Sequence, residues 1–160
     1  MLERENRWLL VLVFFCGLLV GFGLYSLMVP GQHTSERVVI ETTGAPEPIG
    51  PYHQAIRDGD LVFLSGQIGL DPTTGNLSAT IEEQTRRVME NQEAVLKEAG
   101  LDFSDVVQAR IYLTNMSDWN TINGIYSQYF NGTYPARAAV IVAGLPKDAK
   151  VEIEMIASAR

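Results

Sequence analysis

The stretch YPARAAVIVAGLPKDAKVEIE, residues 134–154, decides the fold that we expect for this chain. It predicts two strands joined by a turn over residues 144–148, where Gly, Pro and Asp gather. The second strand alternates as a pleated strand requires. Val151, Ile153 and Met155 share one face, and Glu152, Glu154 and Ile156 share the other.

The first strand is apolar except for Arg137, which follows Pro135 and enters the run 138–143. A guanidinium is costly to bury unless an anion meets it. The anion could be Glu152 or Glu154 in an internal ion pair. It could equally be a ligand carboxylate, which the planar fork of Arg binds in bidentate fashion. Charge patterning leaves both interpretations open.

An uncharged run of 22 residues, 8–29, is rich in Leu, Val, Phe and Gly. As a helix it would measure about 33 Å, enough to cross a hydrocarbon core of about 30 Å. The run is longer than the apolar region of a signal peptide, and no clear small-residue cleavage site follows. We therefore expect an uncleaved single-pass transmembrane helix, with a cleaved signal as the alternative.

This span divides the chain into a short tail (1–7), the transmembrane helix, a linker (30–36) and a folded domain (37–160). Arg4 and Arg7 precede the span, and basic residues tend to stay on the cytoplasmic side. The pattern favours an N-terminus inside and a domain outside the cytoplasm.

The charge of the domain limits its partners. From residue 44 onward there are nine Lys or Arg against fifteen Asp or Glu, a net charge of about −6. Such a field repels a phosphate backbone, which argues against a nucleic-acid partner. Cys16 is the only cysteine and lies inside the apolar run, while His33 and His53 have no second ligand at metal spacing. We expect neither a metal nor a cofactor.

Two helices are predicted within the domain. The first covers about 81–99 and begins with a capping box of Thr80 and Glu83. The second covers about 118–130, with Ser117 as its expected cap.

Further strands are predicted over 37–42, 53–57, 61–65 and 106–113, with a loop over 66–75. The order β-β-β-α-β-α-β-β defines an α+β domain in which two helices cover one face of a mixed sheet. The other face must be buried by something else, and oligomerisation is the natural candidate.

Several separated motifs resemble the reactive intermediate deaminases, the Rid (YjgF-type) imine/enamine deaminase family. The resemblance covers about residues 44–159. Its main motifs are IGPY at 49–52, LSGQ at 64–67, EQTR at 83–86, YPAR at 134–137, LPK at 145–147 and VEIE at 151–154.

The resemblance implies a chorismate-mutase-like fold, assembled as a homotrimer with active sites in the clefts between protomers. It implies that Arg137 grips the substrate carboxylate and that Glu152 positions the hydrolytic water. Tyr52, Ser65 and Asn123 match the residues that line the cleft.

Two positions depart from the family pattern. Ala139 stands where the family commonly has Cys or Thr, and Gly144 stands where it has Arg. The changes remove a hydrogen-bond donor and a positive charge near the expected site, and they bear on the substrate range.

We therefore expect a membrane-tethered enzyme that hydrolyses 2-aminoacrylate-type 2-iminoacids to 2-oxoacids and ammonia. This chemistry needs an anchored carboxylate, an oriented water and a proton acceptor. The alternative is a non-catalytic module that binds small carboxylates or a protein. Structural roles stay open too, because Tyr52 could cap the core and Ser65 could bond to backbone. RNA cleavage, claimed for some family members, conflicts with the negative charge.

Overall fold

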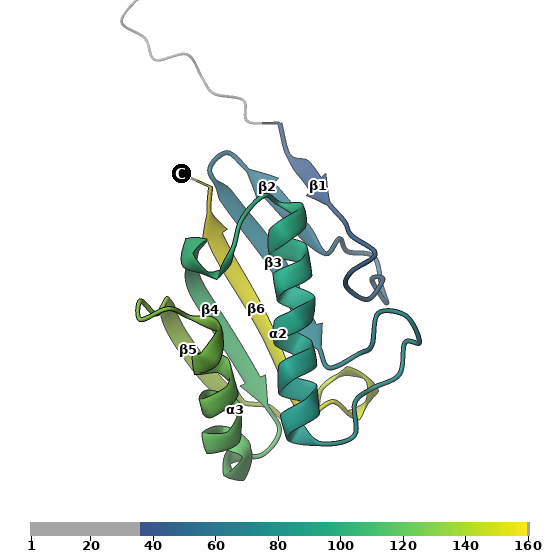
Figure 1. The fold of residues 1–160 in the computed structure, drawn as a ribbon. Coiled ribbons are helices and arrows are strands. Elements are labelled where there is room, and N and C mark those ends of the chain that lie inside the picture. The colour runs from purple at the N-terminus through teal and green to yellow at the C-terminus, as the bar shows by residue number, and fades with distance from the viewer. Residues whose placement is uncertain (1–35, 160) are drawn as a thin grey trace, which may run out of the picture. The chain divides into compact units, whose positions relative to one another are not determined.

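A computed structural model of the protein describes residues 36–159, which form a six-stranded mixed sheet with two helices on one face (Figure 1). The helices are α2 (Ile81–Glu98) and α3 (Trp119–Tyr126). The strands are β1 (Val38–Ile40), β2 (Ala55–Asp58), β3 (Leu61–Ile68), β4 (Val106–Leu113), β5 (Ala136–Ile141) and β6 (Val151–Ser158). The predicted α+β class and element order are confirmed.

In residues 36–159, no helix combines the length and apolar character needed to cross a membrane. The predicted tail, span and most of the linker lie outside the described residues.

The strand order is β1-β2-β3-β6-β4-β5, and only β4 and β5 run parallel. The two strands of the 134–154 stretch are therefore not neighbours, because β4 lies between them. The cause is helix α3, which connects β4 to β5 as a β-α-β unit and so returns the chain parallel to β4 at the sheet edge. The chain then crosses the end of β4 through a short 3₁₀ turn, Pro146–Asp148, and enters β6 on its other side.

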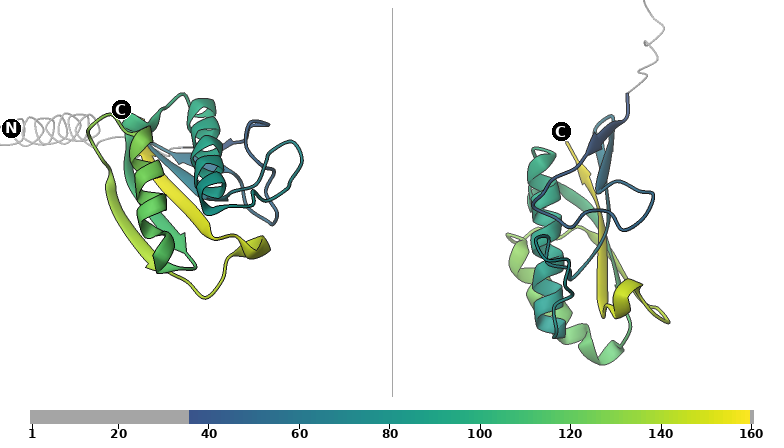
Figure 2. Two further views of the ribbon diagram at one scale, coloured as in Figure 1. Left: turned by 60° about the horizontal axis from the view of Figure 1, so that its bottom comes forward. Right: turned by 90° about the vertical axis from the view of Figure 1, so that its right-hand side faces the viewer.

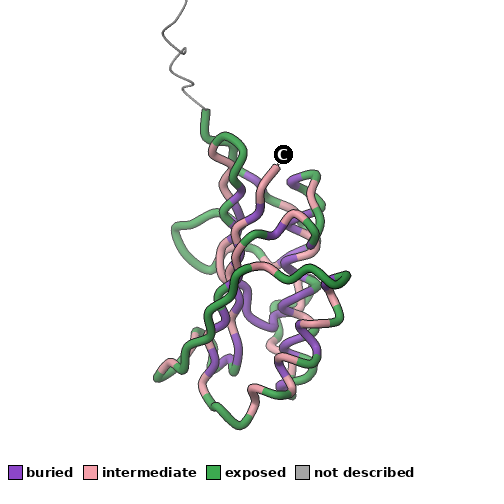
Figure 3. The backbone as a smooth tube through the Cα atoms, turned by 90° about the vertical axis from the view of Figure 1, so that its left-hand side faces the viewer, coloured by how far each residue is buried: buried purple, intermediate pink, exposed green. Residues whose placement is uncertain are grey.

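The core lies between the helices and one face of the sheet (Figures 2 and 3). Strand β6 alternates buried and half-buried residues along all eight positions, as its sequence predicts. Figure 2 shows both helices on one side of the sheet. The largest side chains in the core, each with under 2 % exposure, include Tyr126, Met89, Leu96, Ile111, Leu113 and Ile153.

The helix ends follow local signals, with one correction. Thr80 and Glu83 form the predicted capping box at the start of α2. The predicted cap of the second helix, Ser117, is wrong. The Asn115 side chain instead accepts a hydrogen bond from the Ser117 N–H at 3.0 Å, which starts a 3₁₀ turn before α3. Helix α3 ends at Tyr126, and a 3₁₀ turn replaces the remainder of the predicted helix.

Strand β3 runs three residues beyond its predicted end at Ser65 and contains a β-bulge. Leu64 pairs with Met155 and Gln67 pairs with Ile153, so two residues of β3 face one residue of β6. The alternation breaks at the bulge, which explains why the sequence indicated a loop from residue 66.

The face of the sheet away from the helices is left open. One cross-strand row on this face is formed by Val39, Ile56, Phe63, Ile156 and Gln108. Val39 and Phe63 are 47 % and 44 % exposed, and Leu61 is 40 % exposed. The prediction that the two helices leave an apolar face uncovered is therefore confirmed for the described residues.

Gln92 holds the bulge from the helix side. Its amide is fully buried and donates to the carbonyl oxygens of Ser65, at 3.0 Å, and Ile153, at 2.6 Å.

Gln92→Leu should lower the free energy of unfolding by about 1–3 kcal/mol, because two carbonyl oxygens lose their donor. Chemical denaturation followed by far-UV circular dichroism measures this loss.

Glu98→Gln, at an exposed position of the same helix, serves as the control and should change stability by less than about 0.5 kcal/mol. An unchanged midpoint in Gln92→Leu would show that the bulge does not depend on this amide.

Candidate active site

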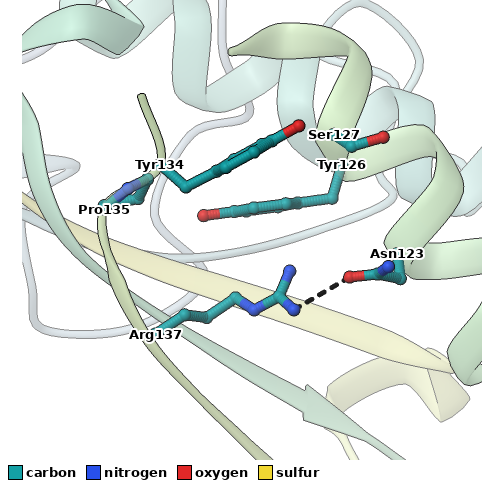
Figure 4. Close-up of a pocket in the computed structure, with 6 residues that line it drawn as sticks. All are labelled: Asn123, Tyr126, Ser127, Tyr134, Pro135 and Arg137. Carbon is teal, nitrogen blue, oxygen red and sulfur yellow. Dashed lines mark hydrogen bonds between the residues drawn. The ribbon is translucent and has the colours of Figure 1, made fainter. Parts of the chain in front are cut away.

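Arg137 lies on the helix side of the sheet. It pairs in register with Ala109, a fully buried residue of β4, so its side chain extends beneath α3. The guanidinium carbon lies 5.0 Å from the ring centre of Trp119 and 4.8 Å from that of Tyr126. One terminal nitrogen donates to the Asn123 side-chain oxygen at 2.8 Å (Figure 4).

This guanidinium borders a cavity of about 450 Å³. The cavity is lined by Asn123, Tyr126, Ser127, Tyr134, Pro135 and Arg137, and no carboxylate is among them. Within residues 36–159, Arg137 makes no ion pair and no hydrogen bond other than the one to Asn123. Most of its donors are therefore available to a ligand.

The internal ion pair considered for Arg137 is not formed. Glu154 binds Arg110 instead, at 2.6 Å, and this bond raises the pKa of Arg110 above its ordinary value. Arg110 is the cross-strand partner of Glu154 on the open face of the sheet, so it reaches the carboxylate directly.

Glu152 also lies on the open face, between Tyr112 of β4 and Ile68 of β3 in register. Its carboxyl is half-buried and rests over Gly66, where a Cβ atom would lie 2.0 Å from the nearer carboxyl oxygen. Any side chain at the Gly66 position would displace the carboxyl. Burial, and to a smaller extent the charge of Glu154, raises the pKa of Glu152 above its ordinary value.

A second cavity, of about 350 Å³, contains Glu152 together with Tyr52 and Ser65. The Ser65 hydroxyl donates to the backbone carbonyl of His53 at 2.6 Å. This is the backbone hydrogen bond that the sequence allowed as a structural role for Ser65. The Tyr52 hydroxyl accepts from the Ile49 N–H at 3.2 Å, while 42 % of the residue stays exposed. Both hydroxyl oxygens retain lone pairs for a ligand or a water.

The predicted site residues thus form two clusters on opposite faces of the sheet. Arg137 and Asn123 belong to the helix-side cluster, and Tyr52, Ser65 and Glu152 belong to the open-face cluster. Within one protomer the structure does not bring the two clusters together. Trp119 also contacts the Arg137 guanidinium and was not among the predicted site residues, although its spacing of four from Asn123 places both on one face of α3. No group of three or more potential metal ligands occurs in residues 36–159.

The fold and the site residues can now be compared with those of known protein families. The family model described as Endoribonuclease L-PSP matches residues 42–159, so the chain belongs to this family, in which its motifs had already placed it by resemblance to the Rid proteins. A RutC family protein of Pyrococcus abyssi is 50 % identical over 120 residues, covering 74 % of this chain and 94 % of that protein. The human 2-iminobutanoate/2-iminopropanoate deaminase is 46 % identical over 122 residues, covering 76 % and 89 %.

Solved structures share the fold. Escherichia coli TdcF with bound serine has a TM-score of 0.74 and 44 % identity, with 76 % of this chain and 98 % of that chain covered. RidA from an Antarctic Psychrobacter has a TM-score of 0.74 and 41 % identity, with the same coverage.

The unusual titration of Glu152 is measurable by ¹³C NMR of its side-chain carboxyl. We expect a pKa above the ordinary value of 4.5, because burial disfavours the charged form. Glu154→Gln should lower this pKa by removing the neighbouring negative charge, without returning it to the ordinary value.

Glu82→Gln, on the exposed first turn of α2, is the matched control and should leave the titration unchanged. A Glu152 pKa at or below 4.5 in the unaltered chain would contradict the half-buried position.

Proposed function

We propose that this protein hydrolyses 2-iminoacids to 2-oxoacids and ammonia. The observation that carries the proposal is the Arg137 guanidinium, which borders a cavity with a single hydrogen bond to Asn123 and no carboxylate partner among the described residues. An unneutralised guanidinium fork is suited to the carboxylate of an amino-acid-like substrate. The name of the human relative supports imine deamination, and the serine bound to TdcF is an amino-acid ligand of the kind that such a fork would hold.

The complete site is proposed to form between protomers of a homotrimer. Arg137 and Glu152 face opposite sides of one sheet, so a cleft that holds both requires the helix-side cluster of one protomer and the open-face cluster of its neighbour. The exposed apolar side chains of the open face support the same assembly, because a contact there would remove Val39, Phe63 and Leu61 from water.

In the proposed reaction, Arg137 fixes the substrate carboxylate and thereby the position of the imine carbon. Water attacks the carbon of the protonated imine, the C=N electron pair moves to nitrogen, and one water proton passes to Glu152, which leaves a neutral carbinolamine. Glu152 then gives this proton to the amino nitrogen. The C–N bond breaks to release ammonia, an oxygen lone pair forms the C=O bond, and the hydroxyl proton passes to the Glu152 carboxylate. A positioned carboxylate base typically contributes about 10²–10⁴-fold to the rate. Tyr52 and Ser65 lie beside Glu152, where their oxygens can orient the water.

Ala139 lies on the same face of β5 as Arg137, because it follows Arg137 by two residues in the strand. A methyl group at this position offers neither a donor nor bulk, and we propose that the site accepts larger 2-iminoacid side chains as a result. Gly144, which stands where the family has Arg, supplies no positive charge near the expected site.

The enzyme is further proposed to be held at a membrane by residues 8–29, with the N-terminus inside and the domain outside the cytoplasm. This proposal rests on the length and apolar character of the run and on Arg4 and Arg7.

Release of ammonia and 2-oxoacid from an iminoacid generated in situ by an amino-acid oxidase tests the activity. Arg137→Ala should lower kcat/KM by about 10- to 150-fold, the equivalent of one charge-assisted hydrogen-bonding contact. Glu152→Gln should lower kcat by about 10²–10⁴-fold, because the proton acceptor is lost. Arg86→Ala, at an exposed position of α2, is the control for loss of one positive charge.

Mixing the two impaired variants tests the shared site. If each site takes Arg137 and Glu152 from different protomers, randomly mixed trimers of Arg137→Ala and Glu152→Gln chains regain about one quarter of the original activity. A site contained in one protomer regains none.

Binding of 2-oxobutanoate without turnover of any iminoacid would instead favour the alternative function, a non-catalytic carboxylate-binding module.

The pH profile should follow Glu152. Activity requires the deprotonated carboxylate, so it should fall as the pH drops through the raised pKa of Glu152. Glu154→Gln should move this acidic limb to lower pH, because the neighbouring negative charge no longer opposes deprotonation. An acidic limb that does not move in Glu154→Gln would contradict the assignment of Glu152 as the base.

A further inference from the structure

Three side chains on one face of α3 surround the Arg137 guanidinium. Trp119, Asn123 and Tyr126 occupy positions i, i+4 and i+7 of the helix, and this spacing places them in one line along the helix axis. Residues seven apart are about 10.5 Å apart along that axis. The guanidinium carbon lies 5.0 Å from the Trp119 ring centre and 4.8 Å from the Tyr126 ring centre, so it fits between the two rings.

From this geometry we infer that Trp119 and Tyr126 are positioning residues, which hold the Arg137 guanidinium for a substrate carboxylate. The inference deepens the proposed function and rests on it. Asn123 fixes one edge of the guanidinium with its side-chain oxygen at 2.8 Å, and the aromatic rings fix its location along α3.

Aromatic neighbours have an advantage over a carboxylate at this position. A carboxylate would neutralise the guanidinium and occupy the N–H groups that the substrate needs. A ring attracts the positive charge through its π-electrons and accepts none of the in-plane hydrogen bonds. Trp119 and Tyr126 therefore stabilise the charged side chain while its donors remain available to a ligand.

For Tyr126 the ring is the active part, not the hydroxyl. Its hydroxyl is buried and has no hydrogen-bond partner among residues 36–159, so it does not hold the guanidinium through a hydrogen bond. Burial raises the pKa of Tyr126 to about 12, so the hydroxyl is protonated at neutral pH and supplies no negative charge. Tyr126→Phe keeps the ring and Tyr126→Leu removes it.

Trp119 offers the cleaner comparison because it is only half-buried and tolerates replacement better than Tyr126, which is 1 % exposed. The probe is 2-oxobutanoate, a 2-oxoacid of the product class, whose affinity for the full chain is measured by titration calorimetry. Trp119→Leu should weaken binding about 5- to 30-fold, because one π face is lost. Trp119→Phe should stay within about threefold of the parent. For turnover, KM should rise in Trp119→Leu by a similar factor while kcat changes less.

Tyr126→Phe and Tyr126→Leu repeat the comparison on the other ring, with the same expected order. In a Trp8→Phe background Trp119 is the only tryptophan, so its fluorescence reports both the folded state and ligand binding in these two variants. Thermal unfolding of every variant separates a lost contact from a lost fold.

The outcomes distinguish this inference from the proposed function. If Arg137→Ala abolishes 2-oxobutanoate binding while Trp119→Leu binds as tightly as the parent, the positioning role is wrong and the function stands. Equal losses in folded Phe and Leu variants would also overturn it, because the ring face would then not be the determinant. If Arg137→Ala itself binds 2-oxobutanoate normally and keeps its turnover, the proposed function fails first.

Discussion

The candidate site is arranged around one guanidinium that has no acidic partner among the described residues. Arg137 enters an apolar strand at the sheet edge, where a charge is costly unless something compensates for it. Helix α3 provides this compensation with an amide oxygen and two aromatic faces. The same helix also connects β4 to β5, so the element that creates the parallel edge strand also carries the residues that accommodate its charge.

A matching constraint operates on the open face. The β-bulge at Ser65 and Gly66 interrupts the pairing of β3 with β6, and Gln92 satisfies carbonyl groups there from the core side. The bulge brings Gly66 under the Glu152 carboxyl, where only a residue without a side chain leaves room. Bulges often re-aim side chains next to active sites, and here the bulge provides the space for a half-buried carboxyl.

Much of this arrangement could be predicted from the sequence, because local patterns are strong where one face of an element is buried. The alternation over 106–113 and 151–156 gave both strands and the correct face for Glu152. The partner of Arg137 could not be predicted, because charge patterning does not show which strands become neighbours. A turn over 144–148 fits a hairpin as well as a crossing past β4, so the sequence did not show that β4 lies between the two strands. The end of β3 was missed for a related reason, since a bulge removes the alternation by which a strand is recognised.

The separation of the two charged groups has a chemical consequence. On one face of one protomer, Arg137 and Glu152 would neutralise each other, and the resulting ion pair would compete with both substrate and water. On opposite faces they cannot pair within the chain, so the guanidinium keeps its free donors and the carboxyl keeps its raised pKa. In the proposed assembly they meet only across a cleft, where substrate and water can lie between them. A site divided in this way makes catalysis conditional on assembly, because each protomer carries both groups on opposite faces of its sheet and cannot bring its own two groups together.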